Sequence, residues 1–116
     1  MMEKVVLFAF RGETLCFVHV MLNAIDMREK GFEVQVVLEG ESTKVIGELS
    51  RQSHPKRKLF EQTKSLGLFA GACKACAHST GTLDAVLAEG LPLLDGMHGH
   101  ADMAGWIQRG FRVIPF

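Results

Sequence analysis

Short hydrophobic runs alternate with longer segments of helical periodicity along the chain. The first run, residues 5–10, is almost entirely hydrophobic, which is typical of a strand buried on both faces of a parallel sheet. Similar runs predict strands over residues 33–38, 68–72, 91–94 and 111–115. The pattern therefore predicts five strands separated by helices.

Residues 13–30 have the periodicity of an amphipathic helix. Leu15, Val18, Leu22 and Ile25 recur on one helical face, and Gly31 is suited to end the helix. We expect this face to pack on the sheet. Shorter helices are predicted around Val45, Ile46 and Leu49, and over residues 55–65, 74–80, 83–89 and 101–109.

Strands that alternate with helices and are joined by right-handed crossovers form a three-layer α/β/α sandwich. We therefore predict such a sandwich, with a five-stranded, mostly parallel sheet. A chain of 116 residues builds one hydrophobic core, so residues 1–116 are expected to form a single domain. The basic, polar stretch 51–58 is expected to be an exposed connection.

Composition argues against several classes of protein. Hydrophobic residues make up 47% of the chain and charged residues 22%, as in globular rather than disordered proteins. Thirteen basic residues balance thirteen acidic ones, so no positive field favours nucleic acid. No hydrophobic run approaches the roughly 18 residues of a membrane span, and the first run is too short for a signal peptide. We expect a cytoplasmic protein without a nucleic-acid partner or a membrane span.

Cys73 and Cys76 form a Cys-x-x-Cys pair that follows the third predicted strand and opens a helix. Backbone amides at a helix start favour a thiolate. Three cysteines, an odd number, argue against a disulfide framework and for metal, redox or nucleophilic use. The third, Cys16, lies in a helical pattern and is predicted to be a small buried hydrophobic residue. Cys73 is therefore the best candidate for a reacting atom.

Four interpretations of this pair compete. Cys73 could be a nucleophile or sulfur acceptor. The two thiols could form a redox pair like that of thioredoxin, although the Trp, Gly and Pro that usually surround that motif are missing. They could bind zinc or iron together with two of His78, His98 and His100. Finally, they could simply pack a tight turn from strand to helix.

Other polar side chains follow the predicted strands at the same end of the sheet. Arg11 and Glu13 follow the first strand, His78 follows the third, and His98 lies in a loop after the fourth. In open parallel sheets, ligands bind beyond the carboxyl ends of the strands, where the strand order reverses. We therefore predict that these four residues bind substrate near the cysteines. Gly12 alone matches neither a dinucleotide-binding nor a phosphate-binding loop, so nucleotide binding is not expected.

Two segments carry a family resemblance. The run Cys73-Lys74-Ala75-Cys76, followed after four residues by Gly81, and the ending 105–114 resemble the DsrE/DsrF-like family of small sulfur-relay proteins. The resemblance covers nearly the whole chain. Cys73 and Cys76 fall on the two motif cysteines of one branch of that family, and Gly81 falls on its motif glycine. The resemblance implies persulfide carriage or sulfurtransferase activity, and homo-oligomers that are often trimers or hexamers.

The leading interpretation is therefore a small sulfur-relay protein. Cys73 would carry sulfane sulfur as a persulfide and pass it to a partner thiol, Cys76 would resolve or protect it, and Arg11 or His98 would tune the charge. Its partners would be sulfur donor and acceptor proteins or small thiols, and it would need no cofactor and no bound metal. The sequence leaves open whether the protein is an enzyme. The alternatives are a non-enzymatic metal-binding module that uses Cys73, Cys76 and nearby histidines, and an oligomer with a dithiol redox pair.

Overall fold

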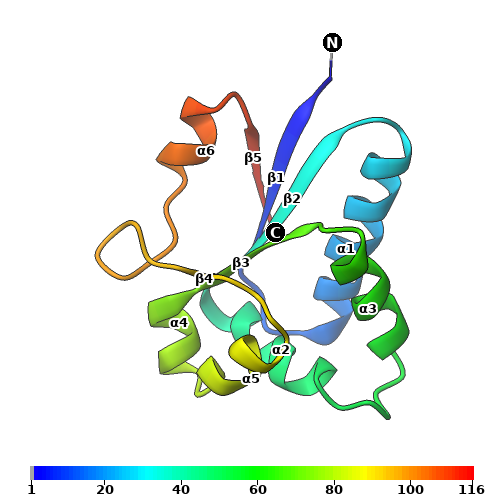
Figure 1. Cartoon of the computed structure of the whole chain (residues 1–116), viewed down its shortest axis with the longest axis vertical. Helices are drawn as coiled ribbons and strands as arrows, with labels where there is room; N and C mark the ends of the chain where they lie inside the picture. Colours follow the sequence, from blue (N-terminus) through cyan, green and yellow to red (C-terminus); the bar gives the residue numbers. More distant parts are fainter. Residues whose placement is uncertain (1) are drawn as a thin grey trace.

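The fold is built on a parallel sheet with layers of unequal thickness on its two faces (Figure 1). The computed structural model describes residues 2–116. Its strands are β1 (Lys4–Ala9), β2 (Glu33–Leu38), β3 (Phe69–Cys73), β4 (Leu93–Leu94) and β5 (Arg112–Pro115). They pair in the order β4-β3-β2-β1-β5, and all four pairings are parallel. The predicted α/β class and five-stranded sheet are confirmed.

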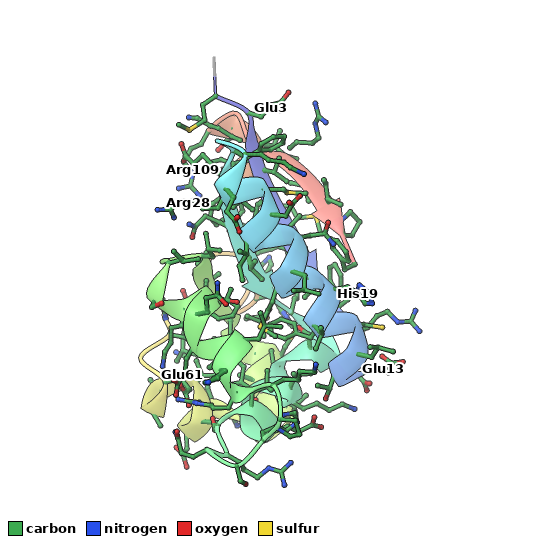
Figure 2. All side chains as sticks on the ribbon, turned by 90° about the vertical axis from the view of Figure 1, so that its right-hand side faces the viewer. Glu3, Glu13, His19, Arg28, Glu61 and Arg109 are labelled. Carbon is green, nitrogen blue, oxygen red and sulfur yellow. The ribbon has the colours of Figure 1, made fainter. Side chains whose placement is uncertain are left out.

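The first face of the sheet carries most of the helices. These are α1 (Thr14–Glu29), α2 (Thr43–Leu49), α3 (Arg57–Ser65) and α5 (Leu83–Ala88), while α4 (Lys74–Ser79) directly follows β3 and a 3-10 turn, η1 (Gly40–Ser42), precedes α2. Figure 2 looks onto this side and shows α1 and α3 in front of the sheet. Alternate residues of β1 (Val5, Leu7 and Ala9) pack here with Phe17 of α1 and Phe60 of α3. This is the larger of two cores.

The second face is covered by residues 95–111, which include α6 (Ala104–Gln108). The β1 residues that point to this face, Val6 and Phe8, pack with Cys73, Ala101 and Phe111. This thinner layer completes an arrangement compatible with the three predicted layers. The smaller core therefore contains the first cysteine of the pair.

One helix presents a different face from the predicted one. Val18 and Ile25 of α1 are buried as predicted, but Leu15 and Leu22 are 70% and 48% exposed. Phe17 is among the residues that fill the core instead. The prediction was wrong because α1 carries hydrophobic residues on both faces, so their spacing alone does not decide which face is buried.

Two further segments differ from expectation. Arg57 belongs to the stretch predicted to be exposed, yet it is only 9% exposed, and its Nη1 donates to the carbonyl of Leu49 at 2.9 Å and the carboxylate of Glu89 at 2.7 Å. The last helix begins at Ala104 rather than Ala101, which is buried in the smaller core. Within residues 2–116, no helix is long and apolar enough to cross a membrane.

Candidate functional site

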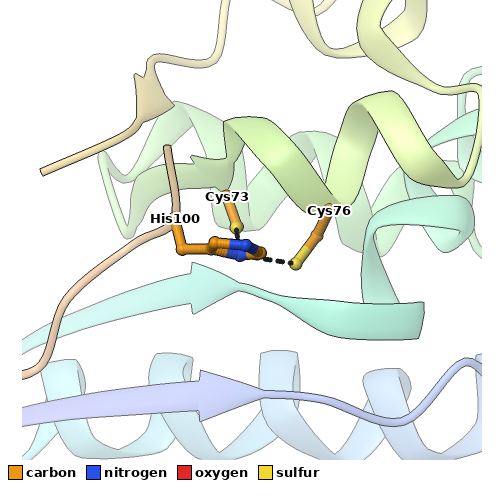
Figure 3. Close-up of side chains that lie close together, drawn as sticks. All are labelled: Cys73, Cys76 and His100. Atoms are coloured by element: carbon orange, nitrogen blue, oxygen red, sulfur yellow. Dashed lines mark hydrogen bonds between the residues drawn. The ribbon is translucent and has the colours of Figure 1, made fainter. Parts of the chain in front are cut away.

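Cys73 and Cys76 both point toward the ring of His100 (Figure 3). Cys73 is the last residue of β3, and Cys76 lies in the first turn of α4. Cys73 Sγ lies 3.4 Å, and Cys76 Sγ 3.7 Å, from His100 Nδ1. Among residues 2–116, these three atoms form the one group of metal-ligating atoms that all lie within 4.8 Å of one another. Two soft sulfur donors and one imidazole nitrogen thus converge.

A tight turn brings His100 back to the cysteines. Met97 and His100 pair across it, with backbone N···O distances of 2.9 and 2.8 Å. His98 and Gly99, between them, have φ values of +50° and +84°, the left-handed conformation that a type I′ turn requires. The amide of Ala75 donates to the carbonyl of Gly99 at 2.9 Å. The turn is therefore fixed to α4, next to the thiol pair.

The two thiols have different surroundings. Cys73 is 0% exposed and packs within the smaller core. Cys76 and His100 line a surface pocket of about 320 Å³, together with Gly40, Ser79 and other residues of η1 and α4. A solute that enters this pocket meets Cys76 rather than Cys73.

The pKa of Cys76 is raised, whereas a position at a helix start predicts a lowered thiol pKa. Burial and the adjacent Cys73 raise the pKa of Cys76 to about 11, and the charge of Glu39 adds to this, while a hydrogen bond from the backbone of Gly40 lowers it. Because α4 has only six residues, its amides contribute little stabilisation of an anion. Cys76 is therefore a neutral thiol at physiological pH.

Glu39 is a residue of this site that the sequence analysis missed. It directly follows β2, and because Leu38 pairs with Ala72, Glu39 lies beside Cys73. Its Oε2 atom is buried and has no hydrogen-bond partner among residues 2–116. Burial raises the pKa of Glu39, whereas a positive charge on His100 would lower it. The sequence signal was its place at the end of a strand, which it shares with Arg11.

The residues predicted to bind substrate do not join the group of Cys73, Cys76 and His100. Arg11 and Glu13 are exposed after β1 and pair with each other at 3.4 Å. His78 is exposed on α4 and lines a different pocket. His98 occupies the tip of the turn and is exposed. The predicted metal set of two cysteines and two histidines is thus reduced to a single histidine, because the turn holds His98 and His100 apart.

The cysteine pair also lies away from the point where the strand order reverses. The chain runs outward from β1 to β4 and then returns to place β5 on the other side of β1. The reversal is therefore between β1 and β5, whereas Cys73 ends β3 in the interior of the sheet. The site therefore lies at the carboxyl ends of the strands, as predicted, but not at the crevice where the strand order reverses.

Comparisons with known proteins identify relatives but no activity. No protein-family model matches the chain, and no solved structure matches it significantly. The "Uncharacterized protein MJ0733" of Methanocaldococcus jannaschii is 30% identical over 96 residues, which are 83% of this chain and 76% of that protein. An uncharacterized protein of Archaeoglobus fulgidus is 30% identical over 43 residues, which are 37% of this chain and 70% of that protein. Because the first similarity extends over most of both sequences, the chain belongs to the same protein family as MJ0733.

Proposed function

We propose that the protein binds a soft or borderline metal ion through Cys73, Cys76 and His100. The observation that carries the proposal is the pair of sulfur–nitrogen distances. Zinc–sulfur and zinc–nitrogen bonds at a tetrahedral angle separate the two donor atoms by about 3.5 Å. The observed separations from His100 Nδ1, 3.4 Å and 3.7 Å, lie on either side of that value. The three donors are therefore spaced to share one ion.

The chemistry of the donors restricts the metal. Thiolates and imidazole select zinc or monovalent copper over magnesium and calcium, which prefer oxygen. Three protein donors fill three positions of a tetrahedron and leave the fourth open, as in catalytic rather than structural zinc sites. Because Cys76 and His100 line a surface pocket, a small ligand has a route to that position.

Thiol pKa values couple metal binding to proton release. A Cys76 thiol with a pKa of about 11 is protonated near neutral pH, so its proton must leave when a metal binds. Binding should therefore weaken as the pH falls. The same protonation keeps the metal-free thiol slow to oxidise.

The test is metal analysis and cobalt titration of untagged protein. We expect one ion per chain, and the charge-transfer absorption of cobalt–thiolate bonds when Co²⁺ is added. Cys73→Ser, Cys76→Ser and His100→Ala should each abolish tight binding. The matched controls Cys16→Ser and His98→Ala, which change residues outside the group, should bind like the wild type. Binding that survives the first three substitutions would reject the proposal.

Access to Cys76 supports a second candidate function, the sulfur relay suggested by the resemblance to the DsrE/DsrF-like family. Cys76 would attack the terminal sulfur of a donor persulfide, R–S–SH, after His100 Nδ1 accepts the thiol proton. The donor S–S bond breaks, Cys76 becomes a persulfide, and the departing R–S⁻ takes the proton from His100. Cys73 would then attack the outer sulfur of Cys76 and become the persulfide, as Cys76 is restored to a thiol. Under this proposal the buried Cys73 is the protected carrier, and Cys76 is the point of entry.

Mass spectrometry after incubation with a small persulfide tests this candidate. We expect a mass gain of one sulfur atom that Cys76→Ser prevents and Cys16→Ser leaves intact. In Cys73→Ser the sulfur should stay on Cys76 and be lost quickly to added thiol. Equal labelling of wild type and Cys76→Ser would reject the relay. If both candidates hold, excess zinc should block labelling, because the same thiols would serve both.

We also propose a cytoplasmic location, which suits either function. Both functions require reduced thiols, and all three cysteines are free in the structure. Thiols stay reduced in the cytoplasm, so we place the protein there. Its partners would be donors and acceptors of the metal ion or of the sulfur atom. The resemblance to the DsrE/DsrF-like family suggests that the protein is a homo-oligomer.

A further inference from the structure

Glu39 has a buried carboxylate oxygen that lacks a hydrogen-bond donor. Its Oε2 atom has no partner among residues 2–116. Buried polar atoms are nearly always hydrogen-bonded, and each exception needs an explanation. A carboxylate at this position therefore indicates that a donor belongs nearby.

The strand register places Glu39 beside Cys73, at the end of the sheet where His100 also lies. Leu38 pairs with Ala72, so the next residues, Glu39 and Cys73, lie side by side at the end of the sheet. Side chains alternate between the faces of a strand, and Val37 belongs to the same core as Cys73, so Glu39 lies on that face as well. Glu39 also lines a pocket together with Ala101, the residue that follows His100.

The donor that fits this oxygen is the second ring nitrogen of His100. Both sulfurs face Nδ1. A neutral imidazole carries one proton, and a ring whose Nδ1 is engaged by a metal carries it on Nε2. Histidines that bind metals commonly donate that second N–H to a carboxylate, which fixes the ring and makes it a stronger ligand.

We propose that Glu39 is a positioning residue: a small rotation of its side chain lets Oε2, which has no partner in the described part of the chain, accept a hydrogen bond from His100 Nε2–H and hold Nδ1 toward the two thiols. The functional meaning of this bond rests on the proposed metal centre. The bond itself can be tested without metal, because it fixes the tautomer of His100.

Nitrogen NMR of histidine-labelled, metal-free protein at about pH 8, where an ordinary histidine is neutral, reads the tautomer directly. We expect the Nε2–H form of His100 in the wild type and a mixture of tautomers in Glu39→Ala. Glu39→Gln keeps an acceptor oxygen without the charge and should partly restore the Nε2–H form. Glu33→Ala removes a glutamate from the opposite end of β2 and should leave His100 unchanged.

Metal affinity gives the second readout. We expect Glu39→Ala to bind Co²⁺ about 10- to 100-fold more weakly than the wild type, with the thiolate charge-transfer absorption retained, and Glu33→Ala to bind normally. Wild-type tautomer and affinity in Glu39→Ala would overturn the inference while leaving the metal centre intact. A wild type that binds no metal would reject the proposed function, and the tautomer would still decide the role of Glu39.

Discussion

At the scale of single residues, the site separates two thiols that look equivalent in the sequence. Cys73 is enclosed by the smaller core, whereas Cys76 meets a surface pocket. Their shared neighbour is one nitrogen of His100. One ring nitrogen can make a good hydrogen bond to only one of the two sulfur atoms, so an ion that engages all three atoms satisfies them better than hydrogen bonds can.

The raised pKa of Cys76 predicts slow alkylation in the metal-free protein. The shift from 9.0 to about 11 lowers the thiolate fraction near pH 8 about 100-fold, and only the thiolate reacts. Iodoacetamide labelling of Cys76, followed by peptide mass spectrometry, should therefore be about 100-fold slower in folded than in urea-unfolded protein. The rate should rise with pH up to about 11. Equal rates for folded and unfolded protein at pH 8 would contradict the raised pKa.

The cysteine pair could be predicted from the sequence, but its partners could not. The spacing of Cys73 and Cys76 and their place after a buried run are local signals. The choice of His100 over His98 depends on the I′ turn at residues 97–100, which turns one ring toward the cysteines and leaves the other at the tip. The position of Glu39 beside Cys73 depends on the register between β2 and β3, which no local pattern encodes.

At the scale of elements, one glycine allows β3 and β4 to approach each other. Gly71 has a φ of +152°, and a Cβ there would lie 2.5 Å from the carbonyl oxygen of Pro92. That contact can be relieved only by moving backbone. We expect Gly71→Ala to lower the free energy of unfolding by about 2–3 kcal/mol, measured by urea denaturation.

The matched control is Gly67→Ala, which lies before β3. Gly67 also has a positive φ, +73°, but a Cβ there meets no atom within 4 Å. Gly67→Ala should lower the free energy of unfolding by about 1 kcal/mol, which is the strain of the left-handed conformation alone. If both variants lose the same free energy of unfolding, the contact with Pro92 is not the reason why residue 71 must be glycine.

Two ion pairs of one buried carboxylate join α3 to the end of α5, and they predict a pH dependence of stability. Glu89 follows α5, its side chain is 7% exposed, and its carboxylate accepts from Arg57 at 2.7 Å and from Lys64 at 2.6 Å. Burial alone would raise the pKa of Glu89, but the hydrogen bonds from Arg57 and Lys64 hold it below its ordinary value. A lowered pKa stabilises the fold above the unfolded-state pKa, and this contribution is lost as the pH falls through the folded-state value.

Glu89→Gln should therefore lower the free energy of unfolding by about 2 kcal/mol at pH 7, and the difference from wild type should shrink below about pH 4. Urea denaturation across this pH range measures it. Glu61→Gln removes a carboxylate that also binds Arg57, at 2.8 Å, but that side chain is 49% exposed. Its cost should stay below about 1 kcal/mol. A difference for Glu89→Gln that grows toward acid would contradict the assigned pKa.

At the scale of the whole molecule, the continuous hydrophobic strands were sufficient to predict the fold class. A run such as residues 5–10 is buried on both faces only in a covered parallel sheet. The order of the strands and the thin layer of residues 95–111 were not predictable, because they depend on how the final crossover packs. That crossover also carries His100, so the site could not be assembled from the sequence alone.

The outer surface of α1 leads to a prediction about assembly. Leu15 and Leu22 are exposed and lie two helical turns apart on α1, the helix that is in front in Figure 2. We expect a homo-oligomer by light scattering, and we expect Leu15→Lys combined with Leu22→Lys to reduce its mass toward that of a single chain. Leu87→Lys, at a 60% exposed leucine of α5, should leave the mass unchanged. A wild type with the mass of one chain would reject this prediction.

The donors of the site come from two parts of the chain, since His100 follows Cys76 by 24 positions. An ion held by both parts would close the intervening segment into a ring and pin the final crossover against the body of the protein. A ligand that binds only the native state stabilises it by about 4 kcal/mol at a thousand times its dissociation constant. Amide hydrogens of residues 95–111 should then exchange more slowly in the loaded protein, so loading would be visible as local rigidity far along the backbone from either sulfur.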